Sequence, residues 1–326
     1  MSERITTDFS LRKVSELPEF VEFSECIADR EGPGSVMADM TFVQFAAIGN
    51  WNPQSICDGY NRLVQIRRTG KRIYYPLWSE EDAAEEPALK ERYLVHFAAE
   101  EKAPFVIVCA GGGYLGCASM IEAYPTCCHL NQQGYHAFVL NYRCGVNAAA
   151  PNPLDDMACA VSYIMEHAQE LGVETQNYAI AGFSAGGHLA ACFGTEAVGW
   201  KKYGLPRPAV CFLAYPVITM GEKSHDSSRQ MFLGEENIKN TELIKQYSAE
   251  KQVTEDYPAT FIWQCDRDNT VPIENSQYFV NALKECHVLY KYETFDSDFH
   301  GWGAGDGSLA EGWIERAVKF WEEVRQ

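Results

Sequence analysis

The stretch 178–190 constrains the fold of this chain most, because its residues follow the order strand, sharp turn, helix. A short β-prone apolar run leads into Gly182-Phe183-Ser184-Ala185-Gly186, and small and apolar residues continue behind it. In that context the G-x-S-x-G pattern predicts Ser184 on a tight elbow, with its hydroxyl above a parallel sheet and at a helix N-terminus. Gly182 and Gly186 are needed because strand and helix pass too closely there to admit a Cβ. The pentapeptide alone is also compatible with an ordinary glycine-rich loop.

The bulk composition is that of a globular enzyme. With 326 residues, 46% hydrophobic and 22% charged, the chain can form one large α/β domain or two smaller ones. A net charge of -18 argues against nucleic acid or an anionic membrane as partner, because phosphate groups require a basic surface. No stretch is apolar and long enough to span a bilayer, and the first ten residues do not form a secretory signal.

The cysteines indicate a reducing compartment. Twelve are scattered along the chain, several of them inside expected strands or helices, and none forms a C-x-x-C pair. We therefore expect buried reduced thiols rather than a disulfide framework or a zinc site, and a cytoplasmic protein. The histidines offer no set of three clustered ligands, so the sequence supports no metal.

Residues 1–75 carry no catalytic pattern and are expected to form an N-terminal extension. Apolar positions at 37–48 favour a helix, which Gly49-Asn50-Trp51-Asn52-Pro53 would end. Three roles stay open for this extension: packing on the edge of the core, covering the active site with help from Trp51, or forming the contact of a homodimer.

Residues 76–326 are expected to form one domain in which strand-like and helix-like runs alternate. This is the pattern of an α/β fold with a mostly parallel sheet flanked by helices on both faces. The predicted strands, beginning just ahead of the domain, are 72–78, 93–97, 105–109, 134–143, 178–181, 208–216, 259–265 and 287–295. The predicted helices are 152–171, the stretch behind Ser184, 274–285 and the amphipathic run at the C-terminus.

Polar segments between these elements carry further expectations. The acidic run 79–87 is typical of a solvated loop, whereas the insertion at about 217–257 is too long for a plain loop. At the C-terminal edge of the sheet this insertion would stand beside Ser184 and form one wall of the substrate site. Asn152 is expected to cap its helix, and the acids Asp155 and Asp156 in the first turn are expected to be structural.

A run of three glycines follows the strand 105–109. Glycines directly behind a buried strand let backbone N–H groups point into open space, which is what an oxyanion hole requires. The alternative is a flexible linker, but the run Ala110-Gly111-Gly112-Gly113-Tyr114 joins an apolar strand to an apolar and aromatic segment. We therefore interpret it as a functional loop.

Three polar groups follow successive strands of the predicted sheet. They are Ser184, an aspartate at position 266 or 268, and His300. Open α/β sheets form their sites at the edge where the strands end, so these groups are expected to meet. The chain order nucleophile, acid, histidine is the order of the α/β-hydrolase fold.

From about residue 90 onwards the chain resembles the esterase branch of the α/β-hydrolase superfamily. The resemblance is to carbohydrate acetyl and feruloyl esterases, which are related to the hormone-sensitive-lipase-like group. The motifs that carry it are the triple-glycine loop, Asn141-Tyr142-Arg143, Pro153-Leu154-Asp155-Asp156, the 182–190 elbow, Tyr247-Ser248-Ala249-Glu250, 268–272 and His300-Gly301. Many lipase-like relatives have a histidine before the triple glycine, where this chain has Ala110.

The resemblance implies specific roles for individual residues. Ser184 is the nucleophile, His300 the general base, and Asp268 the acid, because the family has its acid three residues before Val-Pro; Asp266 is the alternative. The implied oxyanion donors are the backbone N–H groups of Gly112, Gly113 and Ala185, and the candidates for the substrate pocket are Tyr114, Phe183 and Trp302. No cofactor is implied.

The function implied is that of a serine hydrolase that cleaves small carboxylic esters through an acyl-enzyme. Acetyl-type groups on sugars are the first substrate expected. The expected partner is this small-molecule ester, and a homodimer stays open. A serine peptidase and an arylformamidase-like amidase on the same fold are alternatives, although about 90 non-repetitive residues cannot supply the β-propeller usual in such peptidases. A non-catalytic hydrolase fold used for binding is the alternative from another class.

Overall fold

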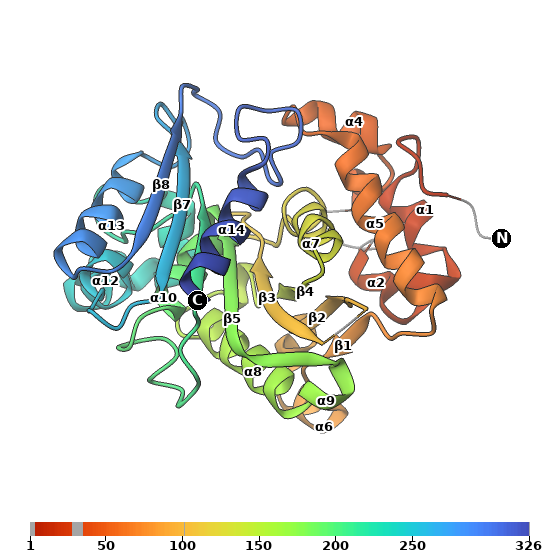
Figure 1. Cartoon of the computed structure of the whole chain (residues 1–326), viewed down its shortest axis with the longest axis horizontal. Helices are drawn as coiled ribbons and strands as arrows, with labels where there is room; N and C mark the ends of the chain where they lie inside the picture. Colours follow the sequence, from red (N-terminus) through yellow and green to blue (C-terminus); the bar gives the residue numbers. More distant parts are fainter. Residues whose placement is uncertain (1–3, 28–34, 101, 326) are drawn as a thin grey trace.

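The computed structural model describes residues 4–27, 35–100 and 102–325 of the chain. Figure 1 shows a central sheet with helices on both of its faces and a further layer of helices near the N-terminus. The strands are β1 (Tyr74–Pro76), β2 (Tyr93–Phe97), β3 (Ala103–Cys109), β4 (His136–Asn141), β5 (Val173–Phe183), β6 (Val210–Ala214), β7 (Ala259–Cys265) and β8 (Tyr290–Phe295). All eight predicted strands are present, with ends that differ from the predicted ends by up to five residues.

Helices surround this sheet. The α-helices are α1 (Leu11–Ser15), α2 (Ser24–Ile27), α3 (Ser35–Ala38), α4 (Phe42–Ile48), α5 (Pro53–Arg68), α6 (Glu80–Glu85), α7 (Ala123–Gln132), α8 (Asn152–Glu166), α9 (Ala168–Leu171), α10 (Ser184–Phe193), α11 (Asp226–Leu233), α12 (Thr241–Tyr247), α13 (Glu274–Glu285) and α14 (Trp313–Arg325). Short 3₁₀ helices cover Pro18–Phe23, Pro87–Glu91, Gly145–Asn147, Glu235–Asn237 and Ala249–Lys251. None of these described helices has both the length and the apolar character needed to cross a membrane.

The sheet is mostly parallel, as predicted. Its strand order is β1-β2-β4-β3-β5-β6-β7-β8. The pairs β1–β2 and β2–β4 are antiparallel, and every other pair is parallel. Strand β3 lies in the middle, where Val106 stands opposite Ala137 of β4 on one side and Ala179 of β5 on the other. The carboxyl ends of six parallel strands therefore meet at one edge.

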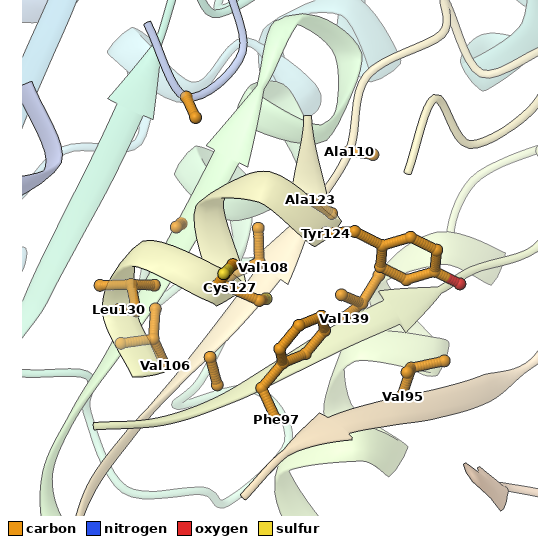
Figure 2. Close-up of a cluster of buried hydrophobic side chains, with 14 of the residues drawn as sticks. Val95, Phe97, Val106, Val108, Ala110, Ala123, Tyr124, Cys127, Leu130 and Val139 are labelled. Carbon is orange, nitrogen blue, oxygen red and sulfur yellow. The ribbon is translucent and has the colours of Figure 1, made fainter. Parts of the chain in front are cut away.

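Side chains of β3 alternate between two buried clusters, one on each face of the sheet. Val106 and Val108 point into the cluster covered by α7 and α14, and Ile107 points into the cluster covered by α8, α10 and α13. Figure 2 shows the first cluster, in which Cys127 and Leu130 of α7 lie above β3. Burying each large aliphatic side chain contributes about 1.5–3 kcal/mol, so this face fixes α7 on the sheet.

The N-terminal extension forms an outer layer beyond α7 (Figure 1). Helix α5 approaches α7 so closely that a Cβ on Gly59 would lie 3.0 Å from the backbone carbon of Tyr124. The ring of Tyr60 stacks on Phe42 and meets Tyr124 edge to face, with centroids 5.8 and 5.1 Å away. Apolar side chains of the extension thus belong to the same buried cluster as α7 and α14.

The acidic run 79–87 is not the plain loop that its charge predicted. Its first part forms α6, because Ser79 and Asp82 make a capping box. The Ser79 hydroxyl accepts from the N–H of Asp82, and the Asp82 carboxylate accepts from the N–H of Ser79, both at 3.1 Å. Acidic residues in a first helical turn are also favoured by the helix dipole.

The helix α8 begins where predicted, but Asn152 does not cap it. Asn152 is already the first helical residue, and its side chain donates instead to the backbone oxygen of Asn147 at 3.0 Å. The two acids have structural partners: buried Asp156 pairs with Arg143 at 2.9 Å, and Asp155 accepts from the Tyr203 hydroxyl at 2.6 Å.

The insertion between β6 and β7 carries α11, α12 and two 3₁₀ helices. It is attached directly to the elbow, because the N–H of Val217 donates to the backbone oxygen of Ser184 at 2.9 Å. Its next residues are held by the buried side chain of Asn275, whose Oδ1 accepts from the N–H groups of Ile218 and Thr219 at 2.9 and 3.1 Å. The insertion therefore stands at the same edge of the sheet as Ser184.

Candidate active site

Ser184 lies at the sharp turn between β5 and α10, as the motif predicted. Its φ is 50°, a left-handed value that is unusual for a residue with a side chain. A Cβ on Gly182 would lie 2.2 Å from the Gly186 oxygen, and a Cβ on Gly186 would lie 2.3 Å from the Ala110 oxygen. Only glycine fits at these two places, so the strained turn depends on both.

A continuous hydrogen-bonded chain joins Ser184, His300 and Asp268. The Oγ of Ser184 is 2.9 Å from Nε2 of His300, and Nδ1 of His300 is 2.7 Å from Oδ2 of Asp268. Because a carboxylate oxygen accepts, Nδ1 carries the ring proton and Nε2 is left to accept from the serine hydroxyl. The ring of Tyr215 meets the His300 ring edge to face, with centroids 4.8 Å apart.

The carboxylate of Asp268 is fully buried and held from several sides. Its Oδ1 accepts from the N–H groups of Thr270 and Val271, both at 2.9 Å, and its Oδ2 accepts from the Gln264 side chain at 3.0 Å. The alternative acid, Asp266, is exposed, and its side chain accepts from the N–H of Ser297. The structure thus brings Asp268, and not Asp266, to His300.

The triple-glycine loop lies against the elbow. A Cβ on Gly111 would lie 2.8 Å from the Cβ of Ser184, and Gly112 and Gly113 have φ values of 124° and 65°. Among the described residues no acceptor faces the backbone N–H of Gly112 or Gly113. Ala185 belongs to the first turn of α10, where N–H groups have no partner within the helix.

Glu122, a residue that the sequence interpretation missed, connects the triple-glycine loop to the loop that carries His300. Its carboxylate accepts from the N–H of Gly111 at 2.6 Å and from the Tyr215 hydroxyl at 2.8 Å, and that hydroxyl accepts from the N–H of Gly303 at 3.0 Å. Burial raises the pKa of Glu122 above its usual value, although both donors oppose this. The sequence signal that could have revealed Glu122 is that it is a single acidic residue within an apolar run just before α7.

Two of the three predicted pocket residues do not line a pocket. Tyr114 and Phe183 are fully buried, because Tyr114 packs on Tyr142 and Phe232 inside the core and Phe183 packs on Tyr215. These two predictions were therefore wrong. An aromatic residue beside a catalytic motif suggested a pocket, but both side chains point into the closely packed faces of the sheet.

Trp302, the third pocket candidate, is half-buried. Its ring lies near Trp263 and Phe299, with centroids 6.2 and 6.0 Å away. Together with Trp51 it lines a cavity of about 370 Å³, but none of the triad residues lines that cavity, so a place of Trp302 in the substrate pocket stays a prediction. Trp51 also donates from its indole Nε1 to the backbone oxygen of Gly301 at 2.8 Å. The extension thus contacts the loop that carries His300.

The buried histidines near the site have protein partners. His188 in α10 lies between the hydroxyl of Tyr114, 2.8 Å from Nδ1, and the backbone oxygen of Tyr247, 2.7 Å from Nε2. Burial lowers the pKa of His188 to about 4, so the ring is neutral and supports the residue that follows the glycines. Within the described ranges no group of three or more His, Cys, Asp or Glu side chains could hold a metal ion.

Comparison with known proteins places these features in a family. The BD-FAE family matches this chain over residues 93–201 and 212–283. The endo-1,4-beta-xylanase B of Butyrivibrio fibrisolvens is 31% identical over 279 residues, which are 82% of this chain and 44% of that protein. The acetylxylan esterase of Xylanibacter ruminicola is 35% identical over 202 residues, 60% of this chain and 40% of that protein. The chain therefore spans less than half the length of both relatives.

Solved structures agree with the fold. The acetyl ester-xyloside bifunctional hydrolase from Caldicellulosiruptor lactoaceticus is 33% identical, with a TM-score of 0.69 over 77% of this chain and 96% of that one. MGS-M1, an α/β-hydrolase enzyme from a deep-sea metagenome library, is 25% identical, with a TM-score of 0.59 over 72% and 92%. The predicted α/β-hydrolase fold and the resemblance to esterases are confirmed by these matches.

Proposed function

The chain belongs to the BD-FAE family, and from that premise we propose that it is a serine esterase that removes acetyl-type groups from sugars through an acyl-enzyme. The observation that carries the proposal is the hydrogen-bonded chain from Ser184 through His300 to Asp268. The acyl group is inferred from relatives: one is named an acetylxylan esterase and another an acetyl ester-xyloside hydrolase.

Ser184 acts as nucleophile in the first half of the reaction. As its Oγ attacks the ester carbonyl carbon, the hydroxyl proton passes to Nε2 of His300, 2.9 Å away. Asp268 holds the imidazole through Nδ1 and stabilises the imidazolium that forms. When the tetrahedral intermediate collapses, the sugar oxygen leaves with the proton from Nε2, and the acetyl group stays on Oγ.

Water then repeats the sequence in the second half. His300 takes a proton from the water, whose oxygen attacks the acetyl carbon, and Oγ leaves with that proton as acetate departs. In both halves the negative carbonyl oxygen would bind the backbone N–H groups of Gly112, Gly113 and Ala185. Glu122 supports this assignment, because it fixes the preceding N–H, that of Gly111, and so holds the loop against the elbow.

The proposal is tested by measuring acetate release from monoacetylated methyl xyloside, and p-nitrophenol release from a series of esters from acetate to octanoate. We expect turnover of the xyloside and a preference for the shortest acyl group. Ser184→Ala should lower kcat by at least about 10³-fold, since a triad acts as a unit. Ser162→Ala on α8 is a matched control and should keep full activity. Retained turnover in Ser184→Ala, or turnover of an aminoacyl anilide alone, would refute the esterase assignment.

The cysteines support the proposal that the protein is located in a reducing cytoplasm. All twelve are free thiols, and those at 57, 109, 127, 128, 192, 211 and 265 are buried. Burial raises the pKa of Cys57 to about 12, which keeps such a thiol protonated and unreactive. Alkylation of free thiols in the denatured protein from its native cells, followed by peptide mass spectrometry, should find the twelve cysteines of this sequence unpaired; paired cysteines among them would argue for an oxidising compartment.

A further inference from the structure

His225, at the start of α11 in the insertion, lies against the triple-glycine loop. A Cβ on Gly113 would be 3.5 Å from Cε1 of His225 and 3.4 Å from Oγ of Ser227. Gly113 is one of the glycines whose N–H has no acceptor in the described part of the chain. The imidazole of His225 therefore borders the space in front of the elbow.

His225 is also within electrostatic reach of the catalytic histidine. The pKa of His225 is lowered, first by burial and then by the positive charge that His300 can carry, and the carboxylates of Asp226 and then Asp268 oppose this to a smaller extent. The ring is therefore neutral at neutral pH. A neutral imidazole beside His300 does not oppose the imidazolium that forms there during catalysis.

The hydrogen bond of Nδ1 fixes which ring nitrogen of His225 carries the proton. Nδ1 is 2.9 Å from Oγ of Ser228, a side chain with no exposed surface. Oγ of Ser228 has no other hydrogen-bond partner among the described residues, and a buried hydroxyl that donates to nothing is costly. The hydroxyl therefore donates to Nδ1, and the proton of the neutral ring is on Nε2.

Nε2 of His225 is thus a free donor next to the site. No described residue accepts from it, and it is bonded to Cε1, the ring atom that would lie 3.5 Å from a Cβ on Gly113. An acetyl methyl group cannot accept a hydrogen bond. The alcohol part of an ester must lie on the His300 side of Ser184, because His300 returns its proton to the leaving oxygen. A donor near His300 therefore matches a second oxygen on the alcohol.

We propose that His225 selects the alcohol of the substrate: its Nε2–H donates to a hydroxyl next to the esterified oxygen, so that monoesters of vicinal diols, as in sugars, react faster than simple alkyl esters. This inference rests on the proposed esterase function. A site that hydrogen-bonds a substrate hydroxyl rejects an analogue without it, because its own polar group is left unpaired. His225 is half-buried, so the expected discrimination is about 10-fold.

Two acetates that differ in one hydroxyl test the proposal: trans-2-hydroxycyclohexyl acetate and cyclohexyl acetate. For the wild-type protein we expect kcat/KM to be about 10-fold higher on the hydroxylated acetate. In His225→Ala this ratio should fall to about 1, and His225→Gln, which keeps a donor, should retain part of it. Gln230→Ala, an exposed change on the same helix, should keep the full ratio.

The outcomes separate this inference from the function on which it rests. If wild type cleaves both acetates with a ratio near 1, or if His225→Ala keeps the wild-type ratio, the role of His225 is refuted while the esterase function stands. If wild type cleaves neither acetate, both the esterase function and the role of His225 are refuted. Where His225→Ala fails to fold, His225→Gln makes the test, because a full wild-type ratio in that variant refutes the role of His225.

Discussion

Trp51 in the N-terminal extension donates a hydrogen bond to the backbone oxygen of Gly301, 250 residues later in the chain and directly after His300. The two heavy atoms are 2.8 Å apart, and the indole ring stacks on Phe45 with a centroid distance of 5.7 Å. The loop that presents the proposed general base is therefore held from outside the hydrolase core. The extension contributes to the geometry of the site as well as to the buried surface.

Replacing Trp51 by Phe should lower kcat by up to about 10-fold, because one hydrogen bond contributes about 0.5–1.5 kcal/mol to the position of the His300 loop. The steady-state kinetics of p-nitrophenyl acetate hydrolysis measure this. Trp78→Phe is the matched control, because the Trp78 indole N–H is buried without a partner among the described residues. An equal loss of kcat in both variants would contradict a specific role for the Trp51 bond.

Glu122→Gln should lower kcat by about 10-fold or more. The carboxylate accepts two hydrogen bonds, from Gly111 and Tyr215, whereas an amide offers one acceptor oxygen and one donor, so one bond is lost. The proposed oxyanion donors follow Gly111 directly, and each such donor is worth about 2.7–4 kcal/mol in the transition state.

The control for this change is Glu322→Gln on α14. Glu322 also accepts from a tyrosine hydroxyl, that of Tyr135 at 2.9 Å, but Tyr135 precedes β4 at the opposite edge of the sheet. Its kcat should stay at the wild-type value. If Glu122→Gln had wild-type kcat, the connection between the two loops would have no catalytic importance.

Asp268→Asn should lower kcat by about 10³–10⁴-fold, and Asp266→Asn should change it by less than about 2-fold. Asp268 accepts from Nδ1 of His300 and is fully buried, whereas the Asp266 side chain is 45% exposed and contacts the backbone of Ser297. Parallel measurement of kcat for the two variants decides between the acids. A larger loss in Asp266→Asn would overturn the assignment.

His188 should make the protein less stable in acid. The pKa of His188 is about 4 in the folded protein and about 6.5 in the unfolded chain. Between these values the unfolded state binds more protons, so the free energy of unfolding is highest above pH 6.5 and falls as the pH drops towards 4. The loss due to His188 should be about 3 kcal/mol.

Urea unfolding of wild type and His188→Gln at pH 7, 5.5 and 4 measures this contribution. Other buried groups, such as His96, whose pKa is also lowered by burial, titrate in both proteins and cancel in the difference. The stability difference between the two proteins should shrink as the pH falls. A difference that is constant with pH would show that His188 does not cause acid destabilisation.

The sequence predicted the sheet and the elbow well, because each depends on local residues. Gly182 and Gly186 are required because a Cβ at either position would clash with neighbouring backbone atoms. The apolar strand β7 has the same first and last residues in the structure as in the prediction. The helix α13 was also predicted with its bounds. Strong periodicity and obligatory glycines are signals that tertiary contacts do not override.

The extension was predicted as a segment, but its packing and the supports of the site were not, because they depend on contacts between distant segments. Helix α5 contains Gly59, which weakens a helix by propensity, yet that glycine is what lets α5 approach Tyr124. The hydrogen bonds from Trp51 to Gly301 and from Tyr215 to Glu122 join residues far apart in the chain. No local pattern encodes such pairs.

Labelling with a fluorophosphonate probe, followed by mass spectrometry of the intact chain and its peptides, tests whether Ser184 is the nucleophile. We expect one adduct per chain, on the peptide that contains Ser184. This adduct should be absent in Ser184→Ala and should form much more slowly in His300→Ala. Ser162→Ala should label like wild type. Labelling at another residue, or undiminished labelling of Ser184→Ala, would contradict the claim that Ser184 is the nucleophile.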